Sequence, residues 1–259
     1  LAVTYSYGYE QIGINLEEAI RLNKLSISLN PEWKVAYESL FEKLLAAGKV
    51  DEARRLAMEH QIDWYKEFYG DIFRNPKSAE FYALLGSTQI TYGNPDGITN
   101  LEIAAEKNNL DAIITLSNIY TGAEKDFIDY QDYPLANFWI RKAIERGDVG
   151  SMVQLASHYS QGFGVNKDVD AAIYWYKKAI ENDNDYWVAK HNLALIYIDK
   201  EDYENAYSLL IDAAKDEYNT SSLIVLSELY LEGNDFMKKD LRKSFDLIYE
   251  AAYKWESRE

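Results

Sequence analysis

The residues of this chain that could do chemistry are three histidines, many carboxylates and one short glycine loop. His60, His158 and His191 each lack a second histidine at the spacing with which a helix presents two metal ligands. The chain has no cysteine, which excludes disulfides and thiolate metal sites. We therefore expect no metal and no cofactor, and we interpret His158 and His191 as polar residues on a helix face that looks into a groove.

The glycine loop Gly162-Phe163-Gly164 resembles a phosphate-binding loop only superficially. No Gly-Lys-Ser/Thr follows it, and the residues before it have helical rather than strand periodicity. Neither a Gly-x-Ser-x-Gly motif nor a protein-kinase signature occurs. Residues 181–185 and 199–202 lack the spacing of a calcium loop, so we interpret them as turns between helices. Carboxylates are abundant, so chance pairs are expected, and only a fold can place two across a hydrolase cleft.

The glycine loop lies between two segments, residues 151–161 and 169–182, that have the pattern of amphipathic helices. Their apolar residues recur at three- and four-residue steps: Met152, Leu155, Ala156 and Tyr159, then Ala172, Trp175, Tyr176 and Ala179. Gly162 and Gly164 end the first helix, Val165 anchors the loop, and Asp168 or Asp170 can cap the second helix. One hairpin cannot bury both stripes, so it needs similar hairpins stacked on either side.

The pattern Leu-Ala-x-x-Tyr-x-x-Gly-x-Gly-Val, an acidic spacer and Ala-x-x-Trp-Tyr-x-Lys-Ala resembles the Sel1-like repeat, a relative of the tetratricopeptide repeat. Residues 151–182 match it almost position for position. The resemblance implies an all-α fold, an α-solenoid wound into a right-handed superhelix of about seven helical hairpins. It also implies a non-catalytic scaffold that binds another protein.

Weaker copies of the pattern occur along the whole chain, so we predict one repeat domain over residues 1–259. Its approximate units are residues 1–30, 31–58, 79–109, 110–147, 148–182, 183–216 and 217–255. Equivalent leucines at 116, 155, 193 and 226 recur at about 33–39 residues, a spacing typical of helical repeats. Small residues at Ala156, Ala172 and Ala194 should let helices approach closely, and Tyr159 and Trp175 should wedge between them.

Residues 59–78 break the repeat pattern with a run of aromatic residues. These are Trp64, Tyr65, Phe68, Tyr69 and Phe73. We favour an extended, inserted helix that packs over the superhelix. The alternative is an aromatic contact surface for a partner, because Trp and Tyr are common interface anchors.

The formal net charge of −16, from 43 acidic and 27 basic residues, favours some partners over others. It would repel a phosphate backbone, so we expect no nucleic acid, and it would attract a basic protein. The alternative is that the charge only keeps an elongated surface soluble. No apolar run approaches the roughly 18 residues of a membrane-spanning helix.

The compartment and the oligomeric state are not determined by these features. The chain begins at Leu1, without Met, within what should be the first helix of a repeat, so we expect that an upstream segment was removed or left out. We expect a soluble protein of the bacterial periplasm or cytoplasm, with the periplasm favoured if an N-terminal signal was removed.

In the related tetratricopeptide repeats, the groove is lined by first-helix positions that are offset from the packing Leu and Ala. Carried onto this chain, these positions are Glu38, Glu42, Ile114, Asn118, Val153, Ser157, His191, Leu195, Asp199, Ile224, Glu228 and Glu232. The line is mixed at its centre and acidic at both ends, which favours a basic peptide or protein face as the ligand. Binding through the loops or the convex face, and a solvated groove without a ligand, remain as alternatives.

Three functions follow from the resemblance. The most specific is an immunity protein that neutralises a secreted antibacterial effector of the lipase type, as some Sel1-like proteins do. The alternative is a general adaptor or regulatory scaffold for a signalling or secretion complex. A remote third is a hydrolase: some Sel1-like proteins associated with penicillin hydrolysis have paired cysteines, which are absent here, and no Ser-x-x-Lys motif is evident.

Overall fold

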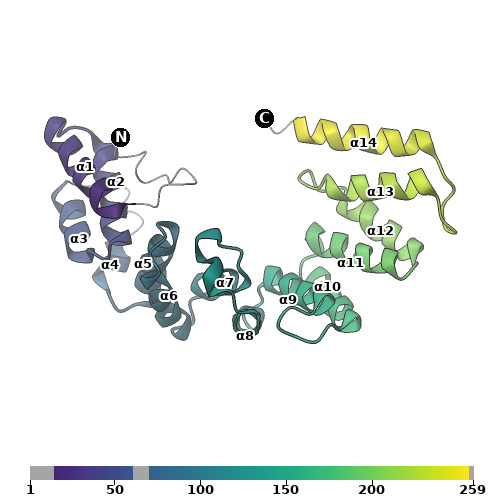
Figure 1. The fold of residues 1–259 in the computed structure, drawn as a ribbon, viewed down its shortest axis with the longest axis horizontal. Helices are drawn as coiled ribbons and strands as arrows, with labels where there is room; N and C mark the ends of the chain where they lie inside the picture. Colours follow the sequence, from purple (N-terminus) through teal and green to yellow (C-terminus); the bar gives the residue numbers. More distant parts are fainter. Residues whose placement is uncertain (1–14, 61–69, 257–259) are drawn as a thin grey trace. The chain divides into compact units, whose positions relative to one another are not determined.

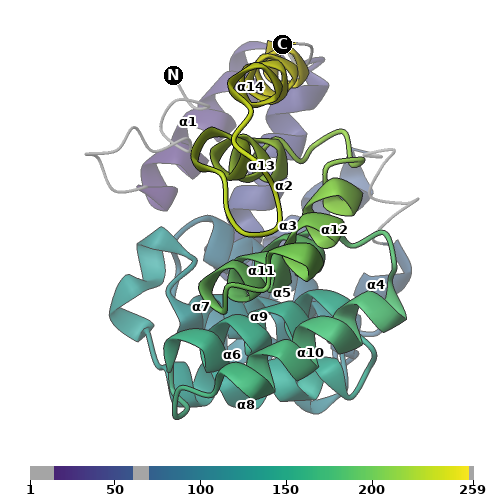
Figure 2. The ribbon, with the colours of Figure 1, turned by 90° about the vertical axis from the view of Figure 1, so that its right-hand side faces the viewer.

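The structure of the protein is a computed structural model, and it describes residues 15–60 and 70–256. Within these ranges the chain is all-α and contains no strand. Helices that are consecutive in the sequence pack against each other as hairpins, as Figures 1 and 2 show. The predicted all-α solenoid is therefore confirmed.

The chain divides into two compact units, residues 1–143 and residues 144–259. The helices described in the first unit are α1 (Leu16–Leu29), α2 (Lys34–Ala46), α3 (Val50–Glu59), α4 (Gly70–Arg74), α5 (Ala79–Thr91), α6 (Asp96–Glu106), α7 (Leu110–Thr121), the 3-10 helix η2 (Lys125–Tyr130) and α8 (Tyr133–Ile144). Those of the second unit are α9 (Val149–Gln161), α10 (Val169–Asn182), α11 (Trp187–Asp199), α12 (Tyr203–Ala213), α13 (Ser221–Glu232) and α14 (Leu241–Glu256). The predicted division into seven repeat units stays a prediction.

Each unit buries apolar residues of successive helices in core clusters. In the first unit, one core cluster includes Phe41 and Leu44 of α2, and a second includes Leu116 of α7 and Phe127 of η2. In the second unit, the stripes of α9 and α10 form a cluster with α11, and α12 and α13 form another with α14. Because each helix contributes to a cluster with its sequence neighbours, stability comes from successive hairpin contacts.

The same backbone hydrogen bond closes four of the hairpin loops. The N–H of an Asp donates to the carbonyl oxygen of the Tyr near the end of the first helix of the hairpin. The distances are 2.9 Å for Asp132 to Tyr120 and 2.8 Å for Asp168 to Tyr159, Asp202 to Tyr197 and Asp240 to Tyr230. The carboxylate of each Asp also accepts from an N–H three residues later. Loops of different lengths therefore begin and end at equivalent positions, and each second helix starts with a cap.

Of the two predicted caps of α10, Asp168 is the one that caps. Its Oδ1 accepts from the Ala171 N–H at 2.9 Å, whereas Asp170 is exposed and lies 3.7 Å from the Lys200 ammonium. Asp168 is the N-cap because its own N–H donates the hydrogen bond that closes the loop. That hydrogen bond fixes the residue at which α10 can begin.

Small residues lie at the helix contacts, as predicted. Ala156, Ala172 and Ala194 are fully buried. Tyr159 and Trp175 are half-buried and pack against the core cluster of α9 to α11, whereas Tyr176 is 3% exposed. Tyr176 is therefore the most deeply buried of these three aromatic residues.

Two predicted features lie outside the described residues or at their edge. The N-terminal repeat signature, Leu1 to Gly8, lies outside them, as do Trp64, Tyr65, Phe68 and Tyr69 of the aromatic run. Phe73 is described: it is 4% exposed and packs against Phe41 and Phe81, with ring centroids 5.9 and 5.6 Å away. Phe73 is thus a core residue of the first unit.

Candidate functional site

The predicted groove positions of the first unit lie on α2 and α7. Glu42 is exposed and accepts a hydrogen bond from the Tyr92 hydroxyl at 3.0 Å, and Glu38 is half-buried. Ile114 and Asn118 are half-buried on α7, and Ile114 packs against a core cluster. Glu42 is thus the exposed acidic position of this set in the first unit.

The predicted groove positions of the second unit differ strongly in exposure. Leu195, Asp199, Ile224, Glu228 and Glu232 are exposed, Ser157 and His191 are half-buried, and Val153 is buried in the core cluster of α9 to α11. The spacing carried from the tetratricopeptide repeats therefore selects a surface on α11 and α13, whereas on α9 it selects a packing residue.

His191 and Ser157 take part in hydrogen bonds between helices. The His191 Nδ1 lies 2.9 Å from the Ser222 Oγ, which joins α11 to α13. The Tyr176 hydroxyl bonds to Ser157 and to Asn192, and burial raises the Tyr176 pKa to about 12. Burial lowers the pKa of His191. These polar groups hold the helices of the second unit in register, a role that the sequence did not reveal.

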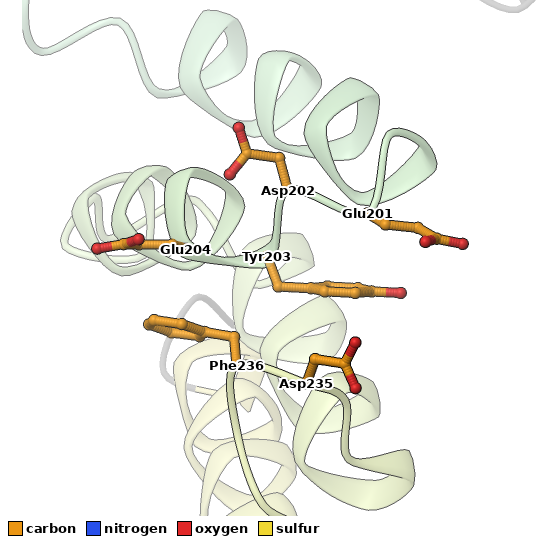
Figure 3. Close-up of a pocket in the computed structure, with 6 residues that line it drawn as sticks. All are labelled: Glu201, Asp202, Tyr203, Glu204, Asp235 and Phe236. Carbon is orange, nitrogen blue, oxygen red and sulfur yellow. The ribbon is translucent and has the colours of Figure 1, made fainter.

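A hollow of about 270 Å³ lies beside two of the exposed groove positions. It is formed by the turn between α11 and α12 and by the loop between α13 and α14 (Figure 3). The residues that line it are Glu201, Asp202, Tyr203, Glu204, Asp235 and Phe236. Asp199 ends α11 and Glu232 ends α13, so both backbone segments that form the hollow leave the C-terminus of a helix.

The hollow combines four carboxylates with two aromatic rings and has no basic residue in its lining. Figure 3 shows the Glu201, Asp202 and Glu204 carboxylates pointing in different directions, with Tyr203 and Phe236 on the two facing segments. One carboxylate is already engaged, because the Asp202 Oδ2 accepts from the Asn205 side-chain amide at 2.8 Å. The lining is therefore a diffuse negative rim around two rings rather than a chelating group.

Packing behind the hollow holds the Phe236 side of it in place. The Phe236 and Tyr207 rings lie 5.9 Å apart, and the Tyr207 and Tyr230 hydroxyls are 3.3 Å apart. The Asn234 Oδ1 accepts from the N–H groups of Phe236 and Met237 at 3.0 and 2.9 Å, which makes a tight loop. Met237 is buried, so it anchors the loop while the neighbouring Phe236 remains 48% exposed.

This lining suits the binding of a cation. Carboxylates supply negative charge, and aromatic faces attract an ammonium or a guanidinium. The helix dipoles add no net preference, because the N-terminus of α12 lies at the hollow together with the C-terminus of α11. The lining contains neither a serine nor a histidine that could act as a nucleophile with its base. Across residues 15–60 and 70–256, no group of three or more His, Asp or Glu side chains could hold a metal ion.

Sequence reasoning missed Tyr203, Asp235 and Phe236. The run from Asp199 to Asp202 was correctly interpreted as a turn, since α11 ends at Asp199 and Asp202 caps α12. A signal was present in the α13–α14 loop: Phe236 precedes the buried Met237, where the α9–α10 loop has Gly164 before Val165. An exposed aromatic residue at a glycine position of the repeat indicates a surface role.

Comparison with known proteins identifies the repeat. The Sel1 repeat family model matches residues 122–148, 149–184 and 220–254. The second match contains the α9–α10 hairpin, and the third contains α13 and most of α14, with Asp235 and Phe236 of the hollow. A comparison with curated proteins gave no match.

Two solved structures align over 98% of this chain. A Sel1 repeat protein from Oxalobacter formigenes is 20% identical, is covered over 70% of its own length and has a TM-score of 0.59. A protective antigen of uropathogenic Escherichia coli strains that displays an SLR fold is 17% identical, is covered over 60% and has a TM-score of 0.38. The first of these likenesses supports the repeat fold. No described helix is both long and apolar enough to cross a membrane.

Proposed function

The chain contains Sel1 repeats, and from this premise we propose that it is a non-catalytic scaffold that binds a basic protein partner through its second unit. Sel1 repeats generally mediate protein–protein interaction, because stacked hairpins expose a long surface of variable side chains on a constant core. The observation that carries the proposal is the hollow of Tyr203 and Phe236 within four carboxylates.

The charge around the hollow supports a basic ligand. The exposed acidic groove positions Asp199, Glu228 and Glu232 lie on the two helices that lead into it. A Lys or Arg side chain of the partner would gain attraction from these carboxylates and cation–π contact with Tyr203 or Phe236. Such contacts set the association rate and the choice of partner more than the total affinity.

More specifically, we propose that the chain is an immunity protein that neutralises a secreted antibacterial effector of the lipase type. This rests on the acidic charge, the repeat scaffold and a hollow suited to one protruding basic residue. The competing adaptor role predicts several weak clients instead of one tight partner.

The first experiment places a photo-crosslinking residue at Phe236 in the full chain, with Tyr174 as the matched position. Tyr174 is 53% exposed on α10, away from the hollow lining. We expect one stoichiometric basic partner that cross-links at position 236 but not at 174, and that remains bound at about 0.3 M salt. Several clients that are lost as salt rises would favour the adaptor, and cross-linking at neither position would reject the hollow as a contact.

The second experiment tests neutralisation with the captured partner. Mixing the partner with the wild-type chain should abolish its toxic activity, and the Tyr203→Ala and Phe236→Ala variants should weaken binding by roughly 10-fold, the loss of one desolvated cation–π contact. Host cells without this chain should become sensitive to the partner. A partner whose activity the chain does not change would exclude the immunity role while leaving the scaffold role in place.

A further inference from the structure

Helix α14 has two apolar faces, and only one of them is packed. Leu247 and Ala251 belong to the core cluster of α12 to α14, and the Lys254 ammonium donates to the Ala214 carbonyl oxygen at 2.7 Å. The second face is exposed: Leu241 59%, Phe245 67%, Ile248 51%, Tyr249 67% and Tyr253 66%. We call these five residues the outer stripe of α14. In Figure 1, α14 is the outermost helix of its unit.

The α9–α10 hairpin shows what normally happens to such a face. Asp168 and Asp240 start α10 and α14 with the same hydrogen bonds, so positions in the two helices correspond with an offset of 72. The counterparts of Leu241, Phe245 and Ile248 are therefore Val169, Ile173 and Tyr176.

On α10 this face is covered. Val169, Ile173 and Tyr176 belong to one cluster with Ala189 and Leu193 of α11, and Tyr176 is 3% exposed. The equivalent Ile248 is 51% exposed. The outer stripe is thus the surface on which this fold packs a further helix.

The stripe is also wider on α14 than on α10. Tyr249 and Tyr253 stand where α10 has the charged, exposed residues Lys177 and Glu181. A helix face that only contacted water would be expected to keep charged residues at these positions. Two tyrosines in their place indicate that a partner covers the stripe, because Tyr is enriched at the cores of interfaces.

We propose that the occupant is α14 of a second copy of this chain, packed antiparallel on the outer stripe in a two-fold symmetric dimer. A two-fold interface is self-complementary, and the stripe can supply both sides of it. The exposed Arg242 lies in the first turn of α14, and the exposed Glu250, which is 4.0 Å from Lys254 of its own helix, lies in the second half. Antiparallel packing therefore places Arg242 of one copy at the end of the helix that carries Glu250 in the other. The two helix dipoles also run in opposite directions.

The area of the stripe is sufficient for a dimer. A large aromatic side chain can bury about 150–250 Å² of surface. The three aromatic side chains of the stripe are each about two-thirds exposed, so together with Leu241 and Ile248 they present on the order of 600 Å² of exposed surface per copy. A standard stable interface buries about 800 Å² per partner, so the stripe and its flanks are of the size of a modest dimer interface.

Electrostatics give this dimer a distinctive salt dependence. Each copy has a formal net charge of −16, so two copies repel each other at a distance. Added salt screens that repulsion and strengthens apolar burial, and dimerisation should tighten as salt rises. A basic partner in the hollow should show the opposite trend, so the two interactions are distinguishable.

Sedimentation equilibrium of the full chain at about 5–100 µM, in 50 and 300 mM NaCl, tests the proposal. We expect a dimer that is tighter at the higher salt, and a dissociation constant at least about 10-fold weaker for the Phe245→Ser/Tyr249→Ser double variant, because two central anchors are lost. The Phe138→Ser variant changes a side chain that is 50% exposed on α8 and should leave the dimer unchanged. A monomer at every concentration, or a dimer insensitive to the double variant, would overturn the proposal.

The absence of cysteine offers a second, geometric test. Ile248 lies at the centre of the stripe, so under mild oxidation Ile248→Cys should form a disulfide-linked dimer. Tyr174→Cys, at an exposed position on α10, should not. Equal cross-linking of the two variants would refute antiparallel packing through α14. The Phe236→Ala variant should still dimerise, so failure of the hollow would leave this test intact.

Discussion

Single aspartates in this protein set where four of its helices begin. Asp132, Asp168, Asp202 and Asp240 each use the backbone N–H to close a loop and the carboxylate to cap the next helix. The two interactions depend on one residue, so the start of the helix cannot slip without breaking both. This explains how the insertion that holds Phe127 and the short Asp199–Asp202 turn can join similar hairpins.

Replacing one of these residues should destabilise the fold by a defined amount. Asp168→Ala removes the cap to the Ala171 N–H and should lower the free energy of unfolding by about 1 kcal/mol. Urea denaturation should show a lower midpoint with an unchanged m-value. Asp168→Asn can still accept that hydrogen bond and should recover most of the loss, so equal losses in the two variants would show that the carboxylate oxygen does not cap.

His158, which is buried, and His191, which is half-buried, should make the stability depend on pH near neutrality. Burial lowers the pKa of His158, which is 6% exposed, so the folded chain holds this proton less tightly than the unfolded chain, whose histidine pKa is about 6.5. The stability that the folded chain gains from a neutral His158 is fully present above about pH 6.5. This stability is lost as the pH falls from about 6.5 toward the lowered pKa of His158 in the folded chain.

Urea denaturation between pH 5 and 7.5 measures this effect. Asp and Glu side chains with ordinary pKa values are already ionised in this range, so their titration contributes little. The wild-type free energy of unfolding should decrease below about pH 6.5, less steeply in His158→Gln and least in His158→Gln/His191→Gln, since burial also lowers the His191 pKa. Parallel pH profiles for the three proteins would contradict the assignment.

At the scale of elements, close helix contacts depend on residues without bulk. Gly86 of α5 and Gly97 of α6 face each other: a Cβ on Gly86 would lie 2.9 Å from the Gly97 carbonyl oxygen, and a Cβ on Gly97 would lie 2.6 Å from the Gly86 carbonyl oxygen. The two backbones are therefore in direct contact, and this contact sets the distance between the helices of that hairpin.

Gly86→Ala should therefore destabilise the first unit by roughly 2–3 kcal/mol, although alanine favours a helix, because a backbone group must move to admit the methyl group. Thermal denaturation followed by circular dichroism measures the loss. Gly93→Ala is the matched control: its φ of +71° strains alanine by about 1 kcal/mol, but its Cβ would meet nothing within 4 Å. A loss at Gly86 no larger than at Gly93 would mean that α5 and α6 can separate without cost.

At the scale of the whole molecule, the dominant property is the net charge of −16. Like charges destabilise a compact state, and salt screens them over about 10 Å at 0.1 M. The melting temperature should therefore rise by a few degrees between about 20 and 200 mM NaCl. An equal osmolality of a neutral osmolyte serves as the control, and a melting temperature that falls with salt would show that specific ion pairs outweigh the general repulsion.

The sequence by itself determined the repeat and the class of fold. Leu155, Ala156 and Tyr159 with Ala172 and Ala179 identified two amphipathic helices, since helix periodicity depends only on local spacing. The same spacing correctly placed Ala156 and Ala172 at buried contacts. The absence of cysteine and the net charge are also sequence properties, and they restrict the partners without any structure.

Only the tertiary structure decided which residues face solvent and which segments meet. Val153 is buried although its spacing placed it in a groove, and Tyr176 is more deeply buried than Trp175 of the same stripe, because small differences in helix rotation decide burial. Tyr203 and Phe236 are far apart in the sequence and line one hollow because α12 and α13 stack. The outer stripe of α14 has a sequence pattern like that of a packed helix, and its exposure follows from its place at the edge of the unit, where no described helix covers it.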